Sequence, residues 1–128
     1  MIFINAVVHP MDGPVIDSGF VAVVGNKIAA VGPMSALPEG EFGEVFDAAG
    51  GHLLPGFVDA HCHLGMFGDG LGFEADDGNE STDPCTAHLR AIDAVNPLDR
   101  CFSEAREGGI TTVLTGPGSA NPIAGQFA

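Results

Sequence analysis

The stretch that decides the fold reads Leu54-Pro55-Gly56-Phe57-Val58-Asp59-Ala60-His61-Cys62-His63-Leu64. It predicts a turn followed by a mostly apolar strand, and such strands are typical of parallel sheets covered on both faces. Side chains alternate along a strand, so Asp59, His61 and His63 are expected on one face and Cys62 on the other. Two imidazoles at this spacing can bind one divalent metal ion, with Asp59 supporting them from behind. A structural, hydrogen-bonded histidine pair is the alternative for the same pattern.

The residues before this stretch predict a small antiparallel β unit. Runs of apolar and β-branched residues cover 2–8, 19–24, 27–31 and 44–47, with turn residues between them. The Gly25-Asn26 pair indicates a tight hairpin. We therefore expect a small β domain over residues 1–52 and a second domain over 53–128.

The residues after it predict a loop, two helices and a second strand. Asp83-Pro84 and Asn96-Pro97 each have the pattern of a helix start, which predicts helices over 85–95 and from 97 to the glycines at 108–109. The β-branched run 110–114 predicts a buried strand. Two strands joined through helices indicate a right-handed crossover between parallel strands.

Length, charge and cysteine content exclude several classes of protein. The chain has 128 residues, of which 45% are hydrophobic, and carries 4 Lys+Arg against 17 Asp+Glu, a net charge of −13. Its few bases are scattered, so neither nucleic acid nor an anionic membrane is an expected partner. The first residues have neither the basic flank of a signal peptide nor the length of a membrane span. Three cysteines without disulfide or metal-ribbon spacing favour a cytoplasmic location.

The stretch 54–64 resembles the signature of the metal-dependent amidohydrolase superfamily, in which PG(F/L/I)(I/V)D(A/T/G)HxH forms the first barrel strand. The segments 78–84, 87–97, 108–113 and 117–121 resemble the imidazolonepropionase-like amidohydrolases. The resemblance implies an α/β fold: a small N-terminal β-sandwich unit followed by the first β-α-β of an incomplete (β/α)₈ TIM-type barrel. A whole barrel needs roughly 200–250 residues, so this chain would hold only its beginning.

The resemblance also implies roles for single residues. His61 and His63 would be metal ligands, and the remaining ligands of the family come from later strands that this sequence lacks. The cofactor would be one or two divalent ions, with zinc expected and iron as the alternative. The parent enzyme would hydrolyse cyclic amide-like or peptide-like C–N bonds of a small-molecule substrate. We expect the 128 residues alone to be inactive and to bind metal weakly.

Polar side chains in the predicted loops and first helix are candidates for the substrate mouth. They are Asp76, Asp77, Asn79, Glu80, His88 and Asn121. The acidic stretch from Asp69 to Asp83 lacks EF-hand spacing, and a solvated loop is its plain alternative. His88 has a partly buried helical position as its alternative. His9 and His52 show no partner pattern and are expected to be solvent or turn residues.

Two other interpretations stay open. The chain could be a non-catalytic metal-binding module that retains the HxH strand, and its unpaired barrel edge would then favour a homo-oligomer. Alternatively, the parent enzyme could be clipped or split, with a missing C-terminal portion supplied separately.

Overall fold

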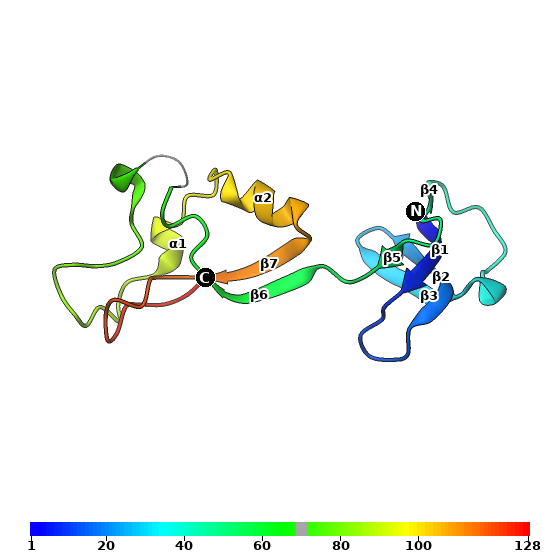
Figure 1. The fold of residues 1–128 in the computed structure, drawn as a ribbon, viewed down its shortest axis with the longest axis horizontal. Helices are drawn as coiled ribbons and strands as arrows, with labels where there is room; N and C mark the ends of the chain where they lie inside the picture. The colour runs from blue at the N-terminus through cyan, green and yellow to red at the C-terminus, as the bar shows by residue number, and fades with distance from the viewer. Residues whose placement is uncertain (69–71) are drawn as a thin grey trace. The chain divides into compact units, whose positions relative to one another are not determined.

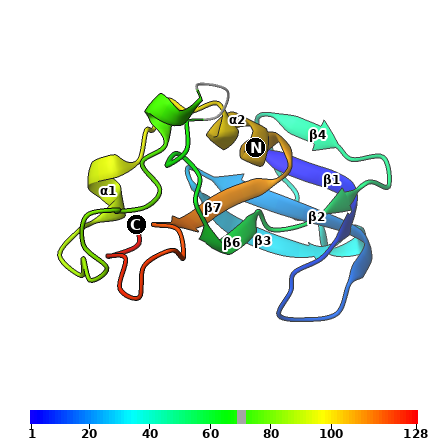
Figure 2. The ribbon, with the colours of Figure 1, turned by 60° about the vertical axis from the view of Figure 1, so that its left-hand side comes forward.

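The computed structural model describes residues 1–68 and 72–128 of the chain. The chain divides into two compact units, Met1–Pro55 and Gly56–Ala128, hereafter the first and the second unit. Figures 1 and 2 show the strands and helices of each unit. Asp69, a member of the predicted acidic stretch, lies outside the described residues.

The first unit is built around a five-stranded sheet. Its strands are β1 (Ile2–Val8), β2 (Ile16–Val24), β3 (Lys27–Pro33), β4 (Val45–Asp47) and β5 (His52–Leu53). The predicted hairpin is confirmed, because Val24 pairs with Lys27 across Gly25-Asn26 and Gly25 takes the left-handed conformation that such a turn requires.

The expectation of a purely antiparallel unit is wrong for β4 and β5. Both run parallel to β1, whereas β1, β2 and β3 pair antiparallel. The chain leaves β3 through a short 3₁₀ helix, η1 (Met34–Ala36), and a connection that brings it back to the start of β1. A connection of this length permits re-entry in the parallel direction, which a tight hairpin cannot give.

Alternation along β2 gives the first unit two apolar clusters. Phe20 and Ala22 pack with Ile2, and residues between 34 and 42 pack against this cluster. Val21 points the other way and packs with Ala6 and Val8. The sheet therefore has buried side chains on both of its faces.

The second unit contains a two-stranded parallel sheet, β6 (Phe57–Cys62) and β7 (Ile110–Thr115). The predicted parallel pair is confirmed, and Figure 1 shows α2 (Cys101–Glu107) on the connection that leads into β7. The other elements are a 3₁₀ helix, η2 (Phe73–Ala75), and the short helix α1 (Ala91–Ala94). No helix among the described residues is long and apolar enough to cross a membrane.

The predicted helix over 85–95 is wrong except at α1. The Asp83 carboxylate accepts the Cys85 N–H in a local turn instead of starting a helix. Residues 85–90 instead lie beside the end of the chain, with a turn at 87–88. The Thr86 N–H donates to the Ile123 carbonyl and the Gln126 N–H donates to the Leu89 carbonyl. These tertiary hydrogen bonds replace the helical ones.

The second predicted helix begins later than expected. The side chain of Asn96 accepts the Leu98 N–H, and the side chain of Asp99 accepts the Cys101 N–H. Two consecutive turns of this kind occupy the segment in which the proline was expected to open the helix, and α2 starts only at Cys101.

Candidate functional site

His61 and His63 lie at the carboxyl end of β6. His61 belongs to the strand and is exposed, whereas His63 follows it and is half-buried. Their ring centroids are 5.3 Å apart and the ring planes stand at 83° to each other. The two imidazoles therefore lie side by side, as the HxH spacing predicts.

A hydrogen bond to the backbone fixes the tautomer of His63. Its Nδ1 lies 2.7 Å from the carbonyl oxygen of Gly116, which follows β7. Because a carbonyl oxygen can only accept, Nδ1 carries the proton and the lone pair of Nε2 stays free. An imidazole held in this way is ready to bind a metal ion through Nε2.

The supporting role of Asp59 behind the imidazoles stays a prediction, and the structure shows a contact of its side chain with the main chain. Its carboxylate accepts the backbone N–H of His61 at 3.1 Å, so its hydrogen bond is to the main chain and not to the ring. The pairing of β6 with β7 is irregular between Asp59 and Cys62, where β6 has one residue more than its partner. Such a bulge interrupts the alternation on which the expectation depended.

The two histidines are an incomplete donor set. Within residues 1–68 and 72–128, no group of three or more His, Cys, Asp or Glu side chains is placed to hold a metal ion. A catalytic zinc ion usually takes three protein ligands and one open position. Imidazole nitrogens are suitable ligands for such an ion, and the two histidines would supply two of its three protein ligands.

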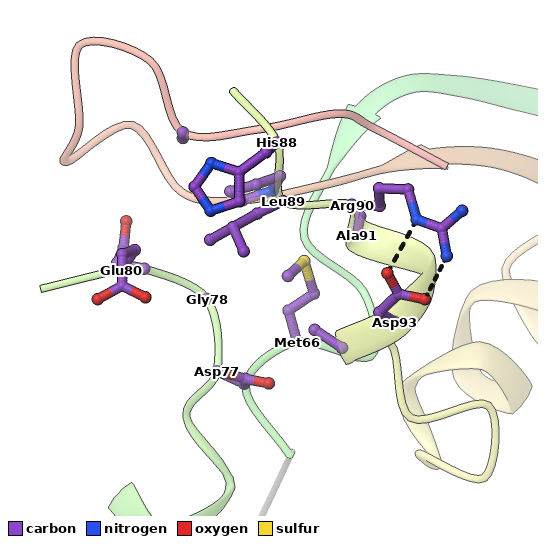
Figure 3. A pocket seen from close by; sticks show the side chains of 13 residues that line it. Met66, Asp77, Gly78, Glu80, His88, Leu89, Arg90, Ala91 and Asp93 are labelled. Carbon is purple, nitrogen blue, oxygen red and sulfur yellow. Dashed lines mark hydrogen bonds and ion pairs between the residues drawn. The ribbon is translucent and has the colours of Figure 1, made fainter. Parts of the chain in front are cut away.

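A cavity of about 300 Å³ gathers several predicted mouth residues in the second unit (Figure 3). Asp77, Asn79, Glu80 and His88 line it, together with apolar side chains such as Met66. His88 lies in a turn rather than on the predicted helix.

The other two mouth candidates act in the loops around this cavity. Asp76 accepts the Gly78 N–H. Asn121 donates from its side chain to the carbonyl oxygens of Glu80 and Asp83, at 2.9 and 3.0 Å. Asn121 thus ties the loop after β7 to the acidic loop.

The cavity wall carries ionised groups whose charge is held by local hydrogen bonds. The hydroxyl and N–H of Thr82 lower the pKa of the Glu80 carboxyl below its usual range. Arg90 donates to both carboxylate oxygens of Asp93, at 2.9 and 2.8 Å, which raises the pKa of Arg90 and lowers that of Asp93 (Figure 3). Arg90 and Asp93 therefore neutralise each other, while Asp77 and Glu80 leave this wall acidic.

Sequence reasoning missed two residues beside the histidines. Gly116 has a usable signal, because it directly follows the second parallel strand and the carboxyl ends of parallel strands meet at one edge. Phe127, whose ring lies 5.2 Å from that of His61, has none in the sequence. His52 is exposed to solvent, as expected, but the two histidines also have a partner that the sequence did not indicate, because His9 Nε2 and His52 Nδ1 are 2.8 Å apart and share a hydrogen bond.

The structure has a small β unit followed by a parallel β-α-β unit, with two histidines at the carboxyl end of the first parallel strand. This is the arrangement that the resemblance to amidohydrolases implies for the start of the chain. Comparisons with known proteins bear on this class. No family model matches the chain. An amidohydrolase of Hapsidospora irregularis is 38% identical over 112 residues, which make up 87% of this chain and 11% of that protein. An imidazolonepropionase of Myxococcus xanthus is 52% identical over 54 residues, 38% of this chain and 13% of that protein.

A solved structure extends the match to nearly the whole chain. The crystal structure of an amidohydrolase from Thermotoga maritima superposes with a TM-score of 0.90 and 43% identity, and covers 99% of this chain and 32% of that one. The chain belongs to the amidohydrolase superfamily and corresponds to an N-terminal portion of its longer members. It spans about a third or less of the relatives that it matches.

The matched proteins differ in substrate. Shorter matches include proteins named as 5-methylthioadenosine/S-adenosylhomocysteine deaminase and adenine deaminase. Hydrolases and deaminases of this family act on C–N bonds. The segment shared with this chain is therefore common to enzymes of several specificities.

Proposed function

We propose that the protein carrying this chain hydrolyses cyclic amide-like or peptide-like C–N bonds of small molecules, in the manner of imidazolonepropionase, and that His61 and His63 are ligands of its divalent metal ion. The observation that carries the proposal is the 2.7 Å hydrogen bond from His63 Nδ1 to Gly116, which leaves Nε2 free beside the ring of His61. Zinc is the proposed metal, as one or two ions, with iron as the alternative.

The chemistry of this class suits a site at the ends of parallel strands. A bound zinc ion supplies a water molecule with a pKa near 7 and polarises a carbonyl group. The residues of this chain would bind and orient. His63 is held by the Gly116 carbonyl and lines a different hollow from the cavity of Asp77, Glu80 and His88. That cavity would offer polar contacts to substrate. Asp76, Asn79 and Asn121 would shape the loops at the same mouth.

Residues 1–128 by themselves are proposed to be catalytically inactive. Two imidazoles leave at least one ligand of a catalytic zinc site to be supplied by residues other than those that the structure describes. Weak metal binding without hydrolysis is the expected behaviour. A zinc-loaded preparation of the 128 residues that hydrolyses a cyclic amide, and loses this activity in His61→Ala, would contradict the proposal of inactivity.

The metal ligands are tested by equilibrium dialysis of the 128-residue chain against Zn²⁺. His61→Ala and His63→Ala are each expected to weaken binding at least about tenfold, because each removes one of two ligands. His52→Ala is the matched control: it removes an imidazole that is hydrogen-bonded to His9 in the first unit, and should leave the affinity unchanged. Unchanged affinity in both His61→Ala and His63→Ala would reject the ligand assignment.

A non-catalytic module is the second candidate function. The apolar side chains of Phe57, Val58 and Leu114 are 55%, 67% and 44% exposed, although they lie on the two parallel strands. A second copy of the chain, or a separate C-terminal portion, would cover them. Light scattering of the purified chain gives its oligomeric state, and an activity assay after addition of a C-terminal portion tests for catalysis. A metal-binding oligomer that stays inactive in that assay would favour the module.

The cellular location is also a proposal. Among the described residues, Cys62 and Cys85 form no disulfide. Free thiols persist in a reducing compartment, which agrees with a cytoplasmic enzyme acting on a small-molecule substrate.

A further inference from the structure

Gly116 connects the end of β7 to both sides of the histidine pair. Its N–H donates to the carbonyl of Cys62 at 3.1 Å, and its own carbonyl accepts Nδ1–H of His63 at 2.7 Å. Gly116 is buried. One residue therefore fixes the backbone between the two histidines and the ring of the second one.

The ring of Phe127 lies directly over Gly116. A Cβ atom at position 116 would be 2.4 Å from Cγ and Cδ1 of Phe127, closer than real Cβ contacts come. Gly116 is not among the residues with positive φ, so the nearby ring, and not backbone conformation, requires a glycine here. Two hydrogen bonds between Thr115 and Ala128, at 2.9 and 2.8 Å, hold the chain next to Phe127 in register with β7.

Phe127 also contacts the first histidine. Its ring centroid lies 5.2 Å from that of His61 with a tilt of 46°. His61 in turn lies against His63. Gly116, His63, His61 and Phe127 thus form a closed four-residue cluster in which each member touches the next.

We propose that Gly116 and Phe127 are positioning residues for the metal-binding pair, Gly116 acting on His63 and Phe127 acting on His61. This inference rests on the proposed function, because it takes both histidines as ligands. The Gly116 carbonyl selects the tautomer of His63 that frees Nε2. Phe127 restricts the exposed ring of His61, so less side-chain freedom is lost when a metal ion binds.

The glycine and the ring depend on each other, which makes a double-substitution test possible. Gly116→Ala inserts a methyl group where the Phe127 ring lies, and so displaces that ring. If the effect runs through Phe127, it vanishes once the ring is absent. Gly116→Ala/Phe127→Ala should then behave like Phe127→Ala alone.

The experiment is a Co²⁺ titration of the 128-residue chain followed by visible absorption, with circular dichroism of each variant to verify folding. Phe127→Ala and Gly116→Ala are each expected to lower Co²⁺ affinity by about tenfold or more, as substitutions around metal-bound histidines do. Phe46→Ala is the matched control, because it removes a phenyl ring stacked on Phe3 in the first unit. It should leave Co²⁺ affinity unchanged.

A second measurement reads the histidines without metal. Long-range ¹H–¹⁵N spectra report which ring nitrogen of His63 carries the proton. Gly116→Ala is expected to reduce the Nδ1–H tautomer, because the added methyl group clashes with the Phe127 ring and so shifts the carbonyl of residue 116. Gly116→Ala/Phe127→Ala is expected to restore the tautomer, and Phe46→Ala to leave it as it is. Unfolding would also lose this tautomer, so the spectra are compared only for variants whose circular dichroism matches that of the unmodified chain.

The outcomes separate the inference from the proposed function. If His61→Ala and His63→Ala abolish Co²⁺ binding but Phe127→Ala and Gly116→Ala do not weaken it, the inference is overturned and the proposed function stands. Additive losses in the double variant also overturn it. If neither histidine variant changes Co²⁺ affinity, the ligand assignment fails and the inference fails with it; the tautomer spectra then show only whether the Gly116 contact exists.

Discussion

The two units of the chain are stabilised in different ways. The sheet of the first unit buries apolar side chains on both faces, as Phe20 at 3% exposure and Val21 at 8% exposure show. In the second unit, Phe57 and Val58 on β6 are more than half exposed, and the buried side chains include the hydroxyls of Thr86 and Thr115. The first unit is therefore held by an apolar core of its own, and the second by hydrogen bonds that tie loops to a two-stranded sheet.

The largest expected effect tests the core of the first unit. Phe20→Ala removes a buried ring and is expected to cost about 3–5 kcal/mol of the first unit's free energy of unfolding. Phe57→Ala makes the same change on an exposed position of β6 and is expected to cost the second unit about 1 kcal/mol or less. A urea titration followed by NMR measures both, because each unit has its own signals. Equal losses would contradict the contrast between the two units.

The next effect tests the hydrogen bonds of the second unit. The buried hydroxyl of Thr115 donates to the carbonyl of Leu64 at 2.8 Å. Thr115→Val keeps the shape but leaves that carbonyl without its donor, which is expected to cost about 1–3 kcal/mol. Thr112→Val, at an exposed position of the same strand, is the matched control and should change stability by less than about 0.5 kcal/mol. The same urea titration distinguishes the two variants. Equal losses of stability would show that the buried hydrogen bond of Thr115 does not stabilise the second unit.

The stability of each unit should depend on pH through a different carboxylate. In the first unit, the Ala49 N–H and then the Asn5 side chain donate to Asp47, which lowers the pKa of Asp47 below its ordinary 3.8. The contribution of an acid with a lowered folded-state pKa is complete above its unfolded value and is lost as the pH falls through the folded value. The melting temperature of the first unit should therefore decrease as the pH is lowered past about 3.8.

Asp47→Asn is the variant that isolates this group. It is expected to lower stability at neutral pH and to flatten the decline in acid, because the amide does not titrate there. In the second unit, Glu80 has the same kind of dependence below its ordinary pKa of 4.5, owing to Thr82. Identical acid profiles for Asp47→Asn and the unmodified chain would show that Asp47 does not contribute.

The features that the sequence predicts well are those that few neighbouring residues decide. The hairpin at Gly25-Asn26 depends on one turn, and the strand 57–62 with its histidines depends on a local apolar run and a recognisable motif. Their physical causes lie within a few residues, so tertiary packing has little opportunity to override them.

The features that it predicts poorly depend on distant segments. Residues 85–90 have helix-start signals and apolar residues at helical spacing, yet their backbone pairs with 123–126 because those hydrogen bonds are available in the folded chain. The direction of β4 and β5 depends on how the chain returns to β1. Phe127 reaches His61 only through the pairing of Thr115 with Ala128. Local pattern contains no information on any of these contacts.

The smallest expected effect concerns residues with positive φ, which differ between the two units. Among the described residues, those with positive φ other than glycine are Asn5, Met11 and Ala49, all in the first unit, whereas the second unit uses glycine at every such position. Ala49 has φ 48°, a conformation that costs an L-residue roughly 1–2 kcal/mol.

Ala49→Gly should therefore stabilise the first unit, even though glycine loses more chain entropy on folding. Subtracting about 0.5–1 kcal/mol for that entropy leaves a net gain of roughly 0–1.5 kcal/mol, visible as a small rise in melting temperature. Ala48→Gly is the neighbouring control: Ala48 lacks a positive φ and packs against the Ala6, Val8 and Val21 cluster, so this change should destabilise the unit. If Ala49→Gly lowers the melting temperature as Ala48→Gly does, the contacts of the Ala49 methyl group outweigh its backbone strain, and the prediction is wrong.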